Sequence, residues 1–176
     1  MGQVIRLPVR PPTYPDRSAE LDAAECVLLT AIRWWVTDHR CGVDPMPRLC
    51  QALDTAGAHD AAFSVDRLMG VIARTVGRPI AIHCPRCPHL SEDEKSLLYA
   101  ANLMQTGDGP RAEKALRTAF LSAQGAEFAL GPLEGLGELF AAARLVFHRR
   151  LPRANSSGTA QIIEPWSSSA SSETVH

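Results

Sequence analysis

The sequence predicts an all-α protein of about six helices, arranged as a compact bundle or as an array of helical hairpins. Apolar residues recur at steps of three and four along most of the chain, which is the period of an amphipathic helix. Capping residues precede several of these segments and glycine follows them. One β-branched stretch, "RPIAIH", is brief and predicts an extended link or a single short strand.

The chain divides into three parts by composition. Residues 1–15 carry Pro8, Pro11, Pro12 and Pro15 and predict an extended arm, because proline fixes its own φ and pushes the preceding residue toward extended conformations. Residues 16–151 form the helical domain. Residues 152–176 hold seven serines and three charged residues, with an "II" pair and Trp166 as the main apolar groups. This tail buries too little surface to offset its chain entropy, so it is predicted to be disordered.

The first helix is expected to span five to six turns before Gly42. Asp16 or Ser18 is available as its N-cap. The residues that share its apolar face are Leu21, Ala24, Leu28, Ala31 and Trp35. A shorter helix is expected after "GVDPMP", from about Pro47 to Ala56.

The third helix is expected to end at Gly77. Its apolar face consists of Val65, Leu68, Met69, Ile72 and Val76. Ser91 and Glu94 then form the S-x-x-E pattern of a capping box, in which each side chain satisfies a backbone donor near the other. The fourth helix should therefore begin at Glu92, where acidic residues also suit the helix dipole.

Two further helices are expected after the "TGDGP" turn. The face of the fifth helix consists of Ala112, Ala115, Leu116, Ala119, Phe120 and Ala123. Gly131 and Pro132 are expected to introduce the last helix, because proline suits a first helical turn. Its inward residues would be Leu136, Phe140, Ala143 and Phe147, with the cations of "HRR" at its carboxyl end.

The segment "YAANLMQTGDGPRAEKALRTAF" resembles one half of a tetratricopeptide repeat. Its small and apolar packing positions are matched by Gly107, Ala112, Leu116 and Ala119. The resemblance covers roughly 25 residues and departs from the repeat in the first helix. A true repeat would imply a binding surface, but we find no second copy, and a solenoid needs about three. The segment predicts a helical hairpin packed through alanines.

The charge balance argues against two classes of partner. The chain has 18 basic and 19 acidic side chains, a formal net charge of −1. Nucleic-acid binding relies on clustered lysine and arginine that replace counterions, and no such cluster is present. A membrane surface is disfavoured for the same reason. We therefore expect neither nucleic acid nor membrane as a partner.

The expected location is the cytoplasm. The amino end lacks the continuous apolar stretch of a secretory signal, and longer apolar runs such as "LFAAARLVF" are too short to span a bilayer. The five cysteines are odd in number and irregularly spaced, which does not suggest a secreted disulfide framework. They are interpreted as reduced thiols or metal ligands.

The stretch "IAIHCPRCPHLSEDE" contains the one candidate site. A Cys-x-x-Cys pair places two sulfurs on one metal from a single turn, so Cys84 and Cys87 could hold zinc. His83 or His89 could supply a third ligand. Cys41, Cys50 or His39, from around the end of the first helix, could complete the site. The candidate metal ligands are therefore Cys84, Cys87, His89 and Cys41, with zinc as the candidate cofactor.

Two other interpretations of this stretch remain open. A dithiol ahead of a helix is typical of thioredoxin-like redox sites, but here the capping box starts the helix beyond Cys87 and no βαβ pattern surrounds it. The favoured interpretation is a stiff connector, in which Pro85 and Pro88 restrict the chain and the cysteines pack as small hydrophobes. Under this interpretation no cofactor is expected.

The favoured function is protein–protein interaction. No G-x-S-x-G or H-E-x-x-H motif is present, and neither histidine of the candidate stretch has a positioned partner, so we expect no catalytic activity. Trp34 and Trp35 are adjacent in a helix and cannot both face the core. The second of the two, Trp35, is the favoured centre of an accessible partner surface, because tryptophan is favoured at interfaces. An adaptor or regulator is thus the first hypothesis, and a zinc or thiol-redox protein using Cys84 and Cys87 is the alternative.

Overall fold

The computed structural model describes residues 14–148 and residue 150. In this part of the chain a short 3-10 helix, η1 (Ser18–Glu20), precedes six α-helices, which confirms the all-α prediction. The helices are α1 (Ala23–Arg40), α2 (Met46–Asp54), α3 (Ala61–Thr75), α4 (Glu92–Gln105), α5 (Gly109–Ala119) and α6 (Ala123–Ala142). The predictions for the arm and the tail fall almost entirely on residues 1–13 and 151–176, outside the described part.

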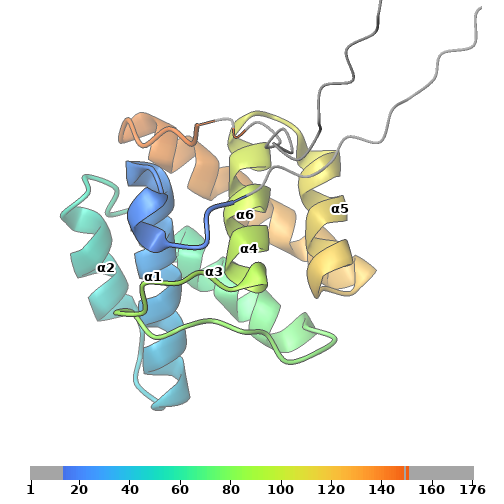
Figure 1. Cartoon of the computed structure of the whole chain (residues 1–176), viewed down its shortest axis with the longest axis horizontal. Helices are drawn as coiled ribbons and strands as arrows, with labels where there is room; N and C mark the ends of the chain where they lie inside the picture. Colours follow the sequence, from blue (N-terminus) through green and yellow to red (C-terminus); the bar gives the residue numbers. More distant parts are fainter. Residues whose placement is uncertain (1–13, 149, 151–176) are drawn as a thin grey trace, which may run out of the picture.

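The six helices form two neighbouring groups of three (Figure 1). In the first group, α1 contacts α2 and α3, and α2 contacts α3. In the second group α4, α5 and α6 all contact one another. Contacts of α3 with α6 and of α1 with α4 join the groups. The chain passes between them through the loop 76–91, which crosses α1 part-way along its length and leads to the start of α4 in Figure 1.

One continuous apolar core lies between these helices. Full burial of one leucine or phenylalanine side chain contributes about 1.5–3 kcal/mol, so this core supplies most of the favourable folding energy. The largest fully buried side chains come from all six helices: Leu28, Ile32, Leu49, Leu53, Leu68, Met69, Ile72, Leu97, Leu98, Leu116, Leu133 and Phe140. The faces predicted for the first and third helices therefore lie in the core, whereas Ala123, predicted on the fifth helix, is the exposed first residue of α6.

Helix α1 begins later than the sequence analysis expected. Its N-cap is Asp22, whose carboxylate accepts from the Glu25 N–H at 2.8 Å while Glu25 accepts from the Asp22 N–H at 3.0 Å. The prediction of Asp16 or Ser18 was wrong because this reciprocal capping box outcompetes a single cap. Ser18 instead donates its N–H to the Pro88 carbonyl at 2.9 Å.

Helices α4 and α5 form the predicted hairpin. Ser91 accepts from the Glu94 N–H at 3.1 Å, and Glu94 accepts from the Ser91 N–H at 2.9 Å, so α4 begins at Glu92 as expected. The turn into α5 places Gly107 at φ +79°, a left-handed conformation that suits glycine. Ala112 and Leu116 are fully buried.

Helix α6 contradicts the prediction that Pro132 starts the last helix. Pro132 lies inside α6, which begins nine residues earlier at Ala123, capped by Ser122 through the Gly125 N–H at 3.1 Å. A proline interrupts one backbone hydrogen bond, here to the carbonyl of Phe128. Phe128 faces solvent, where water can satisfy that carbonyl. Buried residues on both sides of Pro132 keep the helix continuous.

The chain beyond α6 also differs from the expectation. The helix ends at Ala142, so the "HRR" segment does not lie on its carboxyl end. Phe147 is nevertheless buried, as predicted, and its ring stacks on Phe140 at 5.7 Å between centroids. Gln105 holds this stretch: it accepts from the Phe147 N–H at 2.8 Å and donates to the Leu145 carbonyl at 3.0 Å.

Candidate functional site

The predicted cysteine site lies on the loop that joins the two groups of helices. The Cys87 N–H donates to the Cys84 carbonyl at 3.0 Å, so the "CPRC" stretch is a closed turn. Cys84 is exposed and Cys87 is half-buried. Residues 77–83 ahead of it contain no regular strand, in agreement with the predicted extended link.

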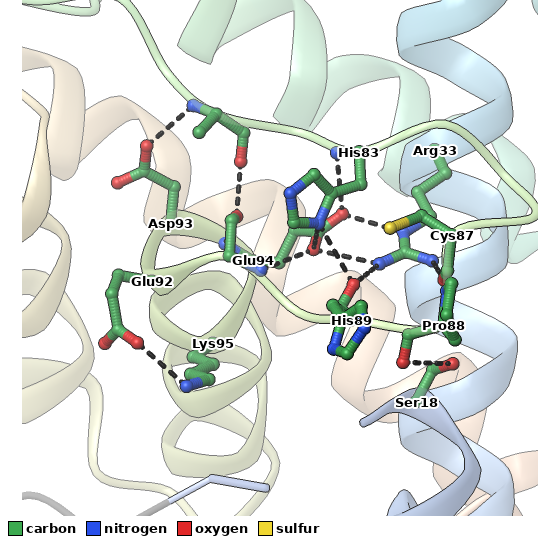
Figure 2. Close-up of polar contacts among 12 residues, drawn as sticks. Ser18, Arg33, His83, Cys87, Pro88, His89, Glu92, Asp93, Glu94 and Lys95 are labelled. Carbon is green, nitrogen blue, oxygen red and sulfur yellow. Dashed lines mark hydrogen bonds and ion pairs between the residues drawn. The ribbon is translucent and has the colours of Figure 1, made fainter. Parts of the chain in front are cut away.

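Arg33 on α1 fixes the position of this loop through hydrogen bonds. It is only 2% exposed. Its Nη1 donates to the Cys87 carbonyl and its Nη2 to the His89 carbonyl, both at 2.6 Å (Figure 2). Because these bonds use backbone carbonyls, the arginine fixes the path of the loop and leaves both thiols out of the network.

Glu94 on α4 completes the same network. Its carboxylate accepts from Arg33 Nε at 2.7 Å and Nη2 at 3.0 Å, and it also accepts the His83 N–H at 3.0 Å. Burial opposes ionisation of Glu94, but the hydrogen bonds from Arg33, Ser91 and His83 outweigh it and lower its pKa. The carboxylate is therefore held charged in the interior.

The neighbouring Asp93 anchors the start of the loop. It accepts from the Ala81 N–H at 2.7 Å and from Arg78 Nη1 at 3.0 Å. Burial opposes its ionisation, yet the bonds from Arg78 and Ala81 lower the pKa of Asp93 overall. The acidic run after the cysteines thus caps α4 and positions the loop.

The predicted metal ligands are not assembled. Among the residues that the structure describes, no group of three or more His, Cys, Asp or Glu side chains is arranged to hold a metal ion. Cys84 and Cys87 share one turn, but Cys41 is the C-cap of α1, eight residues and about 12 Å along the axis beyond Arg33. His89 is exposed, and it is the carbonyl of this residue that contacts Arg33.

The other proposed ligands are engaged elsewhere. The His39 ring stacks on Trp35 at 4.5 Å between centroids, and Cys50 packs against the core from α2. The thiols of Cys84 and Cys87 are both free, and α4 begins five residues after Cys87, so its N-terminus does not adjoin the dithiol. These placements favour the connector interpretation of the loop.

A second feature, absent from the sequence analysis, is an open groove between α1 and α3. We call it the α1–α3 groove; its volume is about 550 Å³ and its lining includes Trp35, Met46, Phe63, Arg67, Gly70 and Arg74. Trp35 forms one wall and is nearly buried, and its Nε1 donates to Asp66 Oδ1 at 2.8 Å. This bond fixes the indole ring against α3.

The α3 side of the groove presents one exposed aromatic residue and two cations. Phe63 is 63% exposed. Arg67, Gly70 and Arg74 follow it at four, seven and eleven residues, which is one face of a helix. Neither arginine forms an ion pair with a residue in the described part of the chain.

The expectation that Trp35 is the accessible tryptophan is wrong, because its side chain packs against α3. Trp35 is buried, so Trp34 is the more accessible of the two, but the guanidinium of Arg48 lies 4.3 Å from its ring centroid. The exposed aromatic residue beside the groove is instead Phe63. The sequence contained a signal for this, because Phe63 falls outside the apolar face of Val65 and Leu68.

Comparison of the chain with protein-family models, with curated proteins and with solved structures gives no match. In the described residues, every helix is too short or too polar to cross a membrane.

Proposed function

We propose that the protein is a non-catalytic adaptor or regulator that binds another protein through the α1–α3 groove. The observation that carries the proposal is the exposed Phe63 beside an open groove walled by Trp35. An aromatic residue at the edge of a concave surface is the usual anchor of a protein interface.

The pairing of the buried carboxylates with arginines supports a non-catalytic role. Each of the four buried carboxylates of the described residues, Glu25, Asp38, Asp93 and Glu94, pairs with an arginine on another segment. In the described part of the chain, no buried side-chain nitrogen or oxygen lacks a hydrogen-bond partner. These groups are engaged in holding the fold, whereas a general base needs a free lone pair directed at a substrate.

A protein partner in the cytoplasm is the expected setting. The near-balanced charge of the chain disfavours a nucleic acid or an anionic membrane as the ligand. Fractionation of cells that express the full chain tests the location: recovery in the membrane pellet or in a secreted fraction would contradict it.

Quantitative affinity purification with two matched variants tests the proposed surface. Phe63→Ser removes the aromatic ring at the groove, and Phe128→Ser removes a ring on α6 that is similarly exposed, at 54%. Neither change removes a core side chain, so both proteins should fold and melt as the parent does. We expect Phe63→Ser alone to deplete the captured partner. Equal capture by both variants would refute the groove as the binding surface.

A further inference from the structure

We propose that the α1–α3 groove recognises an acidic segment of its partner, with one apolar side chain seated between Phe63 and Trp35 and carboxylates paired to Arg67 and Arg74. The inference rests on the proposed function and adds the chemistry of the partner. The occupant is a short peptide segment of another protein, in the manner of an amphipathic segment laid into a groove.

The charges of the groove carry the first part of the argument. Its lining contains two arginines, Arg67 and Arg74, and one carboxylate, Asp66, which gives a formal charge of +1 when His39 is neutral. Asp66 already accepts the Trp35 Nε1 hydrogen. Neither arginine has an ion-pair partner in the described part of the chain. Arginine forms two-point hydrogen bonds with carboxylates, so both cations are available for the same type of ligand.

Arg48, in the same group of helices, differs from Arg67 and Arg74 in its surroundings. Arg48 on the neighbouring α2 is also partly exposed, but its Nε lies 3.2 Å from the Asp38 carboxylate and its guanidinium covers Trp34. Among the residues that the structure describes, no carboxylate forms an ion pair with Arg67 or Arg74. The partner is therefore expected to supply the missing acidic groups.

Gly70 allows the Arg74 side chain to lie close to α3 inside the groove. This glycine lies one turn before Arg74 and between the two cations, where an added Cβ would meet Arg74 Nη1 at 3.3 Å. A glycine inside a helix is less favourable than alanine, so the sequence accepts a less stable helix at this point. The missing side chain makes room for the Arg74 guanidinium against α3, and Phe63 and Trp35 line the same groove.

The spacing of the arginines restricts the acidic segment. Arg67 and Arg74 are seven residues apart on α3, about 10.5 Å along the helix axis. Carboxylates match this spacing when they are two turns apart on a partner helix, or about three residues apart on an extended chain. The apolar anchor then falls between the two acids.

The test begins with selection of peptides on the full-length protein. A phage-displayed library of random peptides of about 16 residues, enough for four helical turns, is enriched and sequenced. We expect the enriched peptides to combine an aromatic or aliphatic residue with at least two Asp or Glu, and to lose affinity as salt rises from about 0.1 M to about 1 M. Affinities are then measured by fluorescence anisotropy with the individual peptides.

Three variants separate the contributions of the arginine charges and of the groove's shape to peptide binding. Arg67→Glu with Arg74→Glu should weaken the selected peptides by at least about tenfold and favour peptides in which lysine replaces the acids. The control pair Arg86→Glu with Lys114→Glu makes the same change in net charge away from the groove and should leave the affinity nearly unchanged. Gly70→Leu should block the groove with a better helix former, so it should lose binding while the melting temperature is maintained.

Different failures have different meanings. Peptides that require Phe63 but tolerate both arginine reversals would overturn the acidic preference and leave the proposed function standing. Enrichment of no peptide, or of peptides insensitive to Phe63→Ser, would overturn both. A full-length variant with Ile162, Ile163 and Trp166 changed to serine provides the remaining check. Tighter peptide binding by that variant would show that the chain's own tail occupies the groove, which would also overturn the proposal.

Discussion

The guanidinium of Arg33 and the carboxylate of Glu94 form a buried two-point ion pair between α1 and α4, with Nε–Oε1 at 2.7 Å and Nη2–Oε2 at 3.0 Å. The same arginine also bonds the carbonyls of Cys87 and His89. One pair of side chains therefore connects α1 to α4 and also fixes the loop that joins the two groups of helices.

Removal of the Arg33 charge should destabilise the fold strongly. Arg33→Met leaves Glu94 buried with no opposite charge, and loss of one partner of a buried pair costs about 3–5 kcal/mol. Arg117→Met is a suitable control, because its pair with Glu113 lies on the surface and is worth under about 1 kcal/mol. Chemical denaturation measures both losses. Similar values for the two variants would show that the buried pair contributes no more than a surface pair.

Stability should fall in acid because of Glu94. A carboxyl whose pKa is lower in the folded protein binds protons more weakly there than in the unfolded chain, so protonation favours unfolding. Its contribution is fully present above the ordinary glutamate value of 4.5 and disappears as the pH falls below it. The difference in unfolding free energy between the parent and Glu94→Gln should be constant near neutral pH and shrink in this acidic range. A difference that is constant down to pH 3 would contradict the prediction.

Ser91→Ala should lower the free energy of unfolding by more than the loss of a helix cap alone would. Ser91 caps α4 through the Glu94 N–H, and its hydroxyl also donates to the Ala81 carbonyl on the loop. Loss of an N-cap costs about 1 kcal/mol, and a second hydrogen bond adds roughly 0.5–1.5 kcal/mol. Ser122→Ala is the matched control, since Ser122 caps α6 through the Gly125 N–H. Denaturant melts that rank Ser122→Ala as the more damaging change would refute this reasoning.

Substitution of the dithiol should leave the protein folded. Cys84→Ser with Cys87→Ser is expected to cost at most about 1–3 kcal/mol, the penalty for a polar atom in a partly apolar site. Purified protein should contain no stoichiometric zinc, and a chelator should not change its melting temperature. One equivalent of zinc with unfolding on chelation would establish the metal alternative. Cys41→Ser would then report whether that thiol is a ligand.

Arg150 is expected to stabilise the fold through its ion pair with Glu25. Its Nε donates to Glu25 Oε1 at 2.8 Å, and Glu25 is fully buried, so Arg150→Met should lower the free energy of unfolding by about 3 kcal/mol or more in denaturant melts.

Deletion of residues 154–176 is expected to leave the melting temperature almost unchanged, because a serine-rich tail should make few buried contacts. A drop of more than a few degrees on deletion would show that this tail contributes to the fold.

Local signals in the sequence were sufficient where a helix is defined by its own residues. The Ser91–Glu94 capping box predicted the start of α4, and the periodic faces of α1 and α3 predicted their buried sides. The same logic failed at α6. Pro132 is a first-turn signal by local propensity, but buried residues before and after it keep one helix continuous.

The sequence by itself determined the fold class, the number of helices in the described part, and the apolar sides that they bury, because each depends on periodicity and caps within a few neighbouring residues. Only the tertiary structure decided which charges are paired. Arg33 and Glu94 are 61 residues apart, and no local pattern distinguishes them from Arg67 and Arg74, which stay unpaired in the described structure. The groove beside Phe63 likewise depends on how α1 packs against α3, since a concave surface is a property of two elements in contact.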